Sequence, residues 1–88
     1  MKVSFTKDFV KQLGQIRDKK LAASIQEAIQ NAEQVKTPWE IKSIKKLKGH
    51  KTAYRIRCGN FRVGIFIEKD EVIFATIDAR KDIYKKFP

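Results

Sequence analysis

The stretch YRIRCGNFRVG, residues 54–64, decides the fold of this chain. Polar and apolar residues alternate on both sides of a central Gly-Asn pair, a pattern typical of a β-hairpin with a two-residue turn. One face of the predicted hairpin is apolar, and the other carries three arginines. The turn fixes the cross-strand pairs as Cys58–Phe61, Arg57–Arg62, Ile56–Val63 and Arg55–Gly64.

The polar face of the hairpin holds Arg55, Arg57 and Arg62. Like charges directly opposite each other destabilise a sheet, and two guanidinium groups about 5.5 Å apart repel by roughly 3 kcal/mol at an effective dielectric constant near 20. A small domain has on the order of 9 kcal/mol of total stability. We therefore expect an anion site, since the planar guanidinium fork suits phosphate. The alternative is three solvated arginines on an exposed sheet face.

The composition indicates one basic domain spanning residues 1–88. Twenty Lys and Arg against ten Asp and Glu give a net charge of +10, which is typical of proteins that bind nucleic acid. No apolar run is long enough for a membrane span, and the first residues do not resemble a signal peptide. We expect a soluble, cytoplasmic protein.

Cysteine and histidine usage argues against several kinds of site. Cys58 is the only cysteine, so no intramolecular disulfide is possible, and its place on the apolar face predicts a core residue rather than a nucleophile. His50 is the only histidine, which argues against a zinc site built from clustered Cys and His ligands. We expect neither a metal nor a cofactor.

Apolar residues recur at helical spacing in two segments, 5–16 and 21–32, with Thr6 and Asp18 as N-caps. So short a link predicts an antiparallel helix pair whose apolar side packs on a sheet. The predicted fold class is α+β. It has an N-terminal strand and this helix pair packed on an antiparallel sheet of about four strands, followed by a short C-terminal helix.

Residues 36–52 give an irregular pattern and are predicted to form a connector, with one helical turn at most. A charge run is commonly a solvated face. This one leads directly into the arginine hairpin, so we expect a basic track that neutralises several RNA phosphates. The candidate RNA-binding residues of the connector are Lys45, Lys46, Lys48, His50 and Lys51.

A turn at residues 69–70 predicts a further strand beside the hairpin. In the simplest register Gly64 and Ala75 lie side by side, which leaves a floor without side chains where a ligand approaches the backbone. The other pairs of this register are Arg62–Ile77 and Phe66–Ile73.

The C-terminal segment adds two further candidates, Arg80 and Tyr84. Four residues apart, they share one face of a predicted helix that reaches the arginine-lined floor. Lys81 is a third candidate for RNA binding. In an alternative interpretation, Tyr84 packs its ring on the sheet.

The order of the short motifs KLKG (46–49), YRIR (54–57), GNFR (59–62) and RKDIY (80–84) resembles the RelE/ParE superfamily of bacterial toxins over essentially the whole chain. RelE-like members cut messenger RNA in the ribosomal A site, without a metal, by attack of a ribose 2′-hydroxyl on the adjacent phosphate. An antitoxin holds them inactive. The resemblance implies that Arg62 and Arg80 bind the scissile phosphate, that Arg55 and Arg57 hold flanking phosphates or ribosomal RNA, and that Tyr84 stacks on a base or assists proton transfer.

Two departures from the family pattern bear on proton transfer. Many relatives have lysine where the first hairpin strand has arginine, and arginine is a poor general acid. Many have histidine where this chain has Ala79. His50 is a candidate for the missing group, with an exposed surface residue as the alternative.

Three functions therefore stay open at this point. The favoured one is a ribosome-dependent ribonuclease whose partners are the ribosome with its messenger RNA and an acidic antitoxin. The second is a ParE-like inhibitor that binds DNA gyrase. The third is a basic RNA-binding module without catalytic activity.

Overall fold

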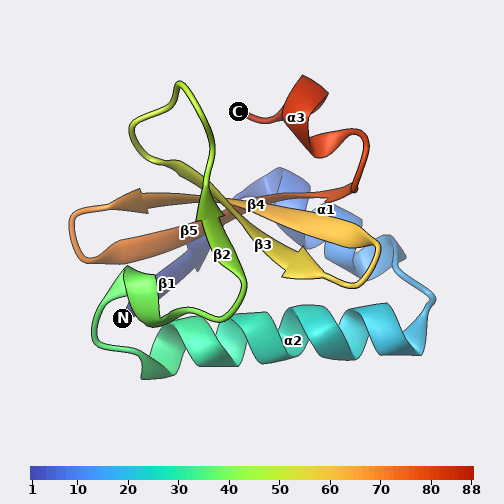
Figure 1. Cartoon of the computed structure of the whole chain (residues 1–88). Coiled ribbons are helices and arrows are strands. Elements are labelled where there is room, and N and C mark those ends of the chain that lie inside the picture. Colours follow the sequence, from blue (N-terminus) through green and yellow to red (C-terminus); the bar gives the residue numbers. More distant parts are fainter.

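The computed structural model describes all 88 residues and contains a five-stranded mixed sheet (Figure 1). The strand order is β1-β5-β4-β3-β2. β1 runs parallel to β5, and all other neighbouring strands are antiparallel. The strands are β1 (Lys2–Phe5), β2 (Ile44–Lys46), β3 (Ala53–Cys58), β4 (Phe61–Glu68) and β5 (Glu71–Ala79).

Both predicted helices are confirmed, as α1 (Lys7–Gln15) and α2 (Lys19–Gln34). The side chains of Thr6 and Asp18 accept hydrogen bonds from backbone amides in the first turns of these helices, as predicted. These amides have no partner within the helix, so each cap stabilises its helix start. The remaining helical elements are a 3₁₀ turn, η1 (Pro38–Glu40), and α3 (Ile83–Lys86).

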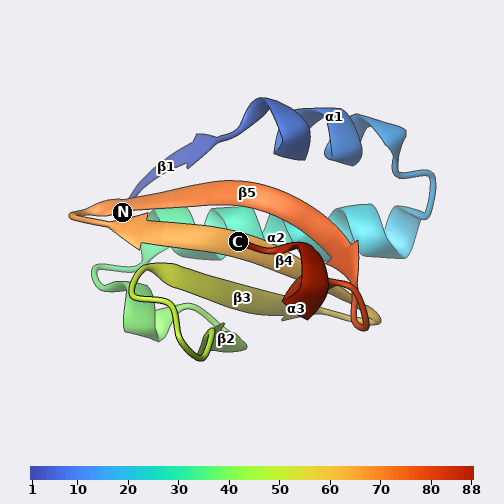
Figure 2. The ribbon, with the colours of Figure 1, turned by 90° about the horizontal axis from the view of Figure 1, so that it is seen from above.

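The helices cover the sheet from three directions (Figures 1 and 2). α2 lies across one face, α3 lies on the opposite face, and α1 lies along the edge formed by β5. At that edge the Gln12 amide donates to the carbonyl of Ile77 at 3.1 Å and accepts from its N–H at 2.9 Å. A side chain of α1 thus pairs the part of β5 that β1 leaves open. The predicted α+β class is confirmed, with five strands in place of about four.

The additional strand, β2, lies in the segment that the sequence predicts as a connector. It pairs with β3 and places Lys45 opposite Arg55. The connector prediction was wrong here because a three-residue strand with two lysines gives no alternating apolar signal. The pairing attaches residues 45–51, called the basic segment below, directly to the arginine hairpin.

The register between β4 and β5 also differs from the prediction. An irregularity between Gly64 and Ile65 shifts the pairing, as a β-bulge does. The prediction assumed unbroken alternation along both strands, and the bulge interrupts that alternation. The pair Phe66–Ile73 is confirmed, whereas Gly64 pairs with Thr76 instead of Ala75, and Arg62 pairs with Asp78 instead of Ile77.

The open floor expected at Gly64 and Ala75 was wrong. A Cβ atom at Gly64 would lie 2.8 Å from the ring of Phe87 and 2.8 Å from Cγ2 of Thr76. Phe87 is itself buried. The glycine therefore makes room for an aromatic ring of the same chain rather than for a ligand.

Two apolar clusters hold the molecule together. The larger one joins the sheet to α1 and α2, with Phe9, Ile25 and Phe74 fully buried. The smaller one, called the second core below, attaches the loop after β2 and the C-terminal segment to the other face of the sheet. None of the helices has the length and apolarity that crossing a membrane requires. The second core consists of Leu47, Ala53, Ala75, Ile83 and Phe87.

Candidate active site

The hairpin predicted from the sequence is confirmed in β3 and β4. Arg57 lies opposite Arg62, and Arg55 lies opposite Gly64. Gly59 in the turn has φ of 61°, a left-handed conformation that costs glycine little. Cross-strand partners share a face, as do residues two apart on one strand. The three arginines therefore lie on the face that α3 partly covers.

Arg62 is the buried member of this arginine cluster, with 6% of its surface exposed. Its Nη1 atom donates to the carbonyls of Gly59 at 2.9 Å and Phe61 at 3.0 Å. The sequence predicts that Arg62 lies beside an open floor at Gly64 and Ala75. The structure instead fixes the guanidinium against its own hairpin turn.

The electrostatic surroundings of Arg62 are unfavourable to its charge. Burial lowers the pKa of Arg62, and the charges of Arg55, Arg57 and Arg80 lower it further. Its neighbour in the register, Asp78, accepts a hydrogen bond from the Thr76 hydroxyl at 3.2 Å. A charge held in such surroundings is typical of a site whose ligand has the opposite charge.

Arg55 connects the edge of the sheet with Tyr84. Its Nη1 atom donates to the carbonyl of Ser43 at 3.0 Å, while its Nε atom is buried without a partner. Donation from this guanidinium toward the phenol oxygen lowers the pKa of Tyr84, and the charges of Lys45 and Arg62 lower it further. The cluster thus makes Tyr84 a stronger acid than an ordinary tyrosine.

Tyr84 projects from α3 and is 59% exposed. The alternative in which its ring packs on the sheet is not what the structure shows, because Ile83 and Phe87 fill that position. The hydroxyl remains accessible beside the arginines.

Arg80 lies close to the cluster, but not on a helix. Its N–H donates to the carbonyl of Asn60 at 3.0 Å, which ties the chain after β5 to the hairpin turn. α3 begins only at Ile83, so the predicted helix face shared by Arg80 and Tyr84 was wrong. Both side chains nevertheless influence the charge of Arg62. The side chain of Arg80 is exposed, and so is that of Lys81.

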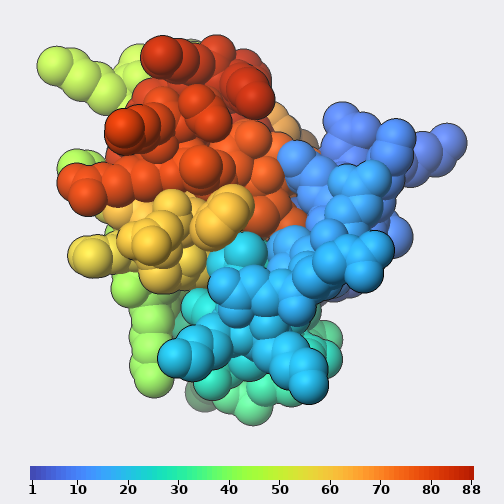
Figure 3. Space-filling view, turned by 90° about the vertical axis from the view of Figure 1, so that its right-hand side faces the viewer, coloured from blue at the N-terminus to red at the C-terminus, as the bar shows by residue number.

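The basic segment adds a pocket beside the arginine cluster. In Figure 3, yellow-green side chains of this segment project next to the red C-terminal segment, which lies above the yellow hairpin turn. The pocket has a volume of about 410 Å³. Lys51 lines an adjoining hollow with Lys46, Lys48 and His50. The residues that line the pocket itself are Lys45, Lys46, Leu47, Lys48, His50, Tyr84 and Phe87.

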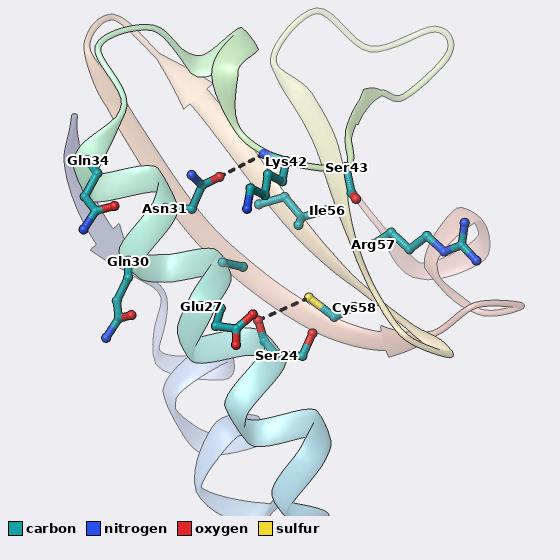
Figure 4. A pocket seen from close by; sticks show the side chains of 11 residues that line it. Ser24, Glu27, Gln30, Asn31, Gln34, Lys42, Ser43, Ile56, Arg57 and Cys58 are labelled. Carbon is teal, nitrogen blue, oxygen red and sulfur yellow. Dashed lines mark hydrogen bonds between the residues drawn. The ribbon is translucent and has the colours of Figure 1, made fainter.

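Another pocket, of about 380 Å³, lies between α2 and β3 (Figure 4). Its lining includes Glu27 and Gln30, and the Oδ1 atom of Asn31 accepts from the N–H of Lys42 at 2.9 Å. Of the predicted site residues only Arg57 lines it, and Figure 4 shows this side chain pointing away from α2. The carboxylate of Glu27 disfavours phosphate there. The arginine cluster on the other face is the better anion site.

Cys58 is a core residue, as predicted. Its Sγ atom lies 4.0 Å from the carbonyl oxygen of Ser24, and burial raises the pKa of its thiol. A raised pKa disfavours the nucleophilic thiolate. No three His, Cys, Asp or Glu side chains gather in a way that would hold a metal ion.

Sequence reasoning missed two residues that shape the site. Ser43, with φ of 61°, offers the carbonyl that holds Arg55, and nothing in the sequence marks it. Phe87 covers Gly64, and here a signal existed, because a glycine inside a strand often marks the close approach of another group.

A sheet with two N-terminal helices, and an arginine cluster beside a short C-terminal helix, defines the class of RelE-type toxin domains. The fold matches a chain of the RelB–RelE antitoxin–toxin complex from Methanococcus jannaschii with a TM-score of 0.76 and 36% identity, covering 96% of this chain and 98% of that chain. It also matches the RelE–RelB complex from Pyrococcus horikoshii with a TM-score of 0.72 and 24% identity, covering 90% and 93% of the two chains.

A sequence relative shows the family. The chain is 44% identical over 93 residues to toxin RelE3 of Methanocaldococcus jannaschii, and the match covers all of both chains. No family model matches the chain. The chain belongs to the RelE family of toxins, which confirms the resemblance seen in its motifs.

Proposed function

We propose that this protein is the toxin of a toxin–antitoxin pair and stops translation by cutting messenger RNA in the ribosomal A site. The observation that carries the proposal is Arg62, a buried charge whose neighbours are three further arginines. An anionic ligand offsets the repulsion among these arginines. The attraction is strongest when the negative charge of the ligand increases, as it does in the transition state of phosphodiester cleavage.

The proposed reaction is attack of a ribose 2′-hydroxyl on the adjacent phosphate, with the 5′-oxygen as leaving group. Guanidinium groups stabilise the negative charge of the transition state. Arg62 is already fixed by two carbonyls, so it binds phosphate with little reorganisation. Arg80, which is exposed, is expected to bind the same phosphate from the solvent side.

The remaining basic residues bind the rest of the RNA in this proposal. Arg55 and Arg57 hold flanking phosphates or ribosomal RNA, and the lysines beside the pocket extend the basic track. Because β2 pairs with β3, Lys45 lies directly beside Arg55 and continues that track. Contacts of this kind contribute affinity without base specificity.

Proton transfer cannot come from the arginines, because they stay protonated at neutral pH. Tyr84 is an accessible ionisable group at the cluster, and its pKa is lowered. A group with such a pKa is better suited than an ordinary tyrosine to move a proton near neutral pH. We therefore assign a proton-transfer role to Tyr84.

The proposed protein partner is an acidic antitoxin. A net charge of +10 and an arginine-rich face attract an acidic segment that folds on contact. The related proteins from M. jannaschii and P. horikoshii were solved as complexes of RelE with RelB. This similarity supports an antitoxin of the same kind here.

The test is to add purified protein to a translation extract and to map RNA 5′ ends by primer extension. Codon-phased cuts are expected with the unchanged protein and with Arg17→Ala, an exposed arginine between α1 and α2. Arg80→Ala is expected to reduce cleavage about 10²-fold or more. Arg80 is preferred over Arg62 because its exposed side chain does not hold the hairpin turn.

The same experiment distinguishes the other functions. Intact messenger RNA together with cleaved, gyrase-bound DNA would contradict the proposal and indicate a ParE-like inhibitor. RNA binding without either effect would indicate a non-catalytic module.

A further inference from the structure

The proposed cleavage requires two proton transfers. The attacking 2′-hydroxyl loses a proton, and the departing 5′-oxygen gains one. Tyr84 can serve one of these steps. Asp78 lies beside Arg62 and accepts from the Thr76 hydroxyl, but it does not line the pocket that Tyr84 lines. The chemistry therefore calls for one more ionisable side chain within reach of Tyr84.

His50 faces the same pocket as Tyr84. Both side chains are exposed, and both line the 410 Å³ pocket beside the arginine cluster. Lys45, which lines this pocket as well, is the cross-strand neighbour of Arg55. The pocket thus brings the one histidine of the chain to the edge of the phosphate site.

The second core holds His50 and Tyr84 in this arrangement. Leu47 is buried against the C-terminal segment, and its N–H donates to the carbonyl of Ala53 at 3.0 Å. The N–H of His50 donates to the carbonyl of Leu47 at 3.3 Å, across a turn in which Gly49 has φ of 83°. Because α3 packs on the same cluster, the loop that carries His50 and the helix that carries Tyr84 share one support.

The charged groups around His50 are basic. Lys45 and Lys46 face it from β2, Lys48 and Lys51 flank it on its own loop, and no carboxylate lines either hollow. An imidazole ring has a nitrogen that can accept a proton, and a phenol has an O–H that can donate one. The pocket therefore holds one side chain suited to each of the two proton transfers.

We propose that His50 takes the proton of the attacking 2′-hydroxyl and that Tyr84 gives its proton to the leaving 5′-oxygen. The 2′-oxygen bonds to phosphorus while the bond from phosphorus to the 5′-oxygen breaks. The products are a 2′,3′-cyclic phosphate and a 5′-hydroxyl. Imidazolium and phenolate then exchange a proton through water, which restores both side chains. This assignment rests on the proposed ribonuclease function.

The test is single-turnover cleavage of messenger RNA on programmed ribosomes, with toxin in excess, between about pH 5.5 and pH 9. The rate of the unchanged protein is expected to rise with pH on the acidic side of its profile, because a general base must lose its proton before it can accept one. His50→Gln is expected to lower the rate about 10²- to 10⁴-fold and to remove this rise. Added imidazole is expected to restore part of the activity of His50→Ala.

Two controls keep the result specific. Lys19→Gln, an exposed lysine at the start of α2, is expected to retain both rate and pH profile. Thermal melting and ribosome cosedimentation of His50→Gln check folding and binding. A variant that binds ribosomes poorly but keeps the rise with pH at saturating toxin would overturn the assignment, because His50 would then contribute only to binding.

The outcomes separate this inference from the proposed function. If His50→Gln cleaves with the rate and pH profile of the unchanged protein, the base assignment is wrong and the ribonuclease function stands. If the unchanged protein does not cleave messenger RNA, both are wrong. The ribonuclease function and the base assignment would both be supported by cyclic phosphate ends on the RNA, together with a rise of the cleavage rate with pH that is lost in His50→Gln.

Discussion

Arg57 and Arg62 occupy opposite positions on β3 and β4, which holds two guanidinium groups close together. Like charges in such pairs destabilise a sheet, so Arg57→Gln is expected to raise the free energy of unfolding by about 0.2–1 kcal/mol. Urea denaturation at low salt measures this change. Arg17→Gln, another exposed arginine, should leave stability nearly unchanged. A fall in stability for Arg57→Gln would show that the cluster does not strain the hairpin.

Tyr84 offers a second test at the level of one residue. Donation from Arg55 lowers the pKa of Tyr84, so its phenolate forms at a lower pH than in an ordinary tyrosine, whose pKa is about 10. The difference in ultraviolet absorbance between the unchanged protein and Tyr84→Phe isolates this titration. Arg55→Gln is expected to move the midpoint upward, and Arg17→Gln to leave it in place. An unmoved midpoint in Arg55→Gln would remove Arg55 as the cause.

At the level of elements, α3 depends on one close contact. A methyl group at Gly64 would lie 2.8 Å from the Phe87 ring, so Gly64→Ala is expected to displace that ring and loosen α3. Hydrogen–deuterium exchange should then rise at the amides of residues 85–87, while β3 and β4 stay protected. Gly14→Ala is the control. Nothing lies within 4 Å of a Cβ there, and alanine stabilises a helix interior by about 0.5–1 kcal/mol. Unchanged exchange in α3 would mean that Phe87 does not anchor it.

The elements differ in how far the sequence predicts them. The hairpin and the two helix starts were predictable because their signals are local: a turn with flanking alternation, and capping side chains. β2 was not, since a short lysine-rich strand acquires its structure from pairing with β3. The bulge after Gly64 was missed although the sequence holds a signal, because Val72, Phe74 and Ile77 pack in one cluster and the two-residue spacing breaks between Phe74 and Ile77.

The candidate site also combines features that the local sequence predicts with features that depend on tertiary packing. Grouping three arginines on one face followed from the turn alone. The contact of Phe87 with Gly64 depends on where the C-terminal segment packs, which no local pattern encodes. His50 was an isolated candidate in the sequence, and only the packing of its loop and of α3 on the second core brings it to the same pocket as Tyr84.

At the scale of the whole molecule, the net charge of +10 predicts how RNA binding responds to salt. Neutralising Z phosphates of a single strand gives a slope of about −0.7Z in a plot of log affinity against log salt concentration. Engagement of the four site arginines alone corresponds to a slope near −3. The double substitution Lys45→Gln and Lys48→Gln is expected to make the slope less steep by about 1.4, if each lysine contacts one phosphate. Fluorescence anisotropy with a short labelled RNA measures both slopes.

The control for this measurement is a double substitution of two exposed lysines, Lys2→Gln and Lys69→Gln, which removes the same charge at the β4–β5 turn, the opposite end of β4 from the Gly59–Asn60 turn. If binding responds only to net charge, both double variants change the slope equally. If the pocket and the arginine cluster form one RNA track, only the variant beside the pocket does. An affinity that stays flat across salt concentrations would contradict phosphate binding altogether, because release of counterions accompanies every phosphate contact.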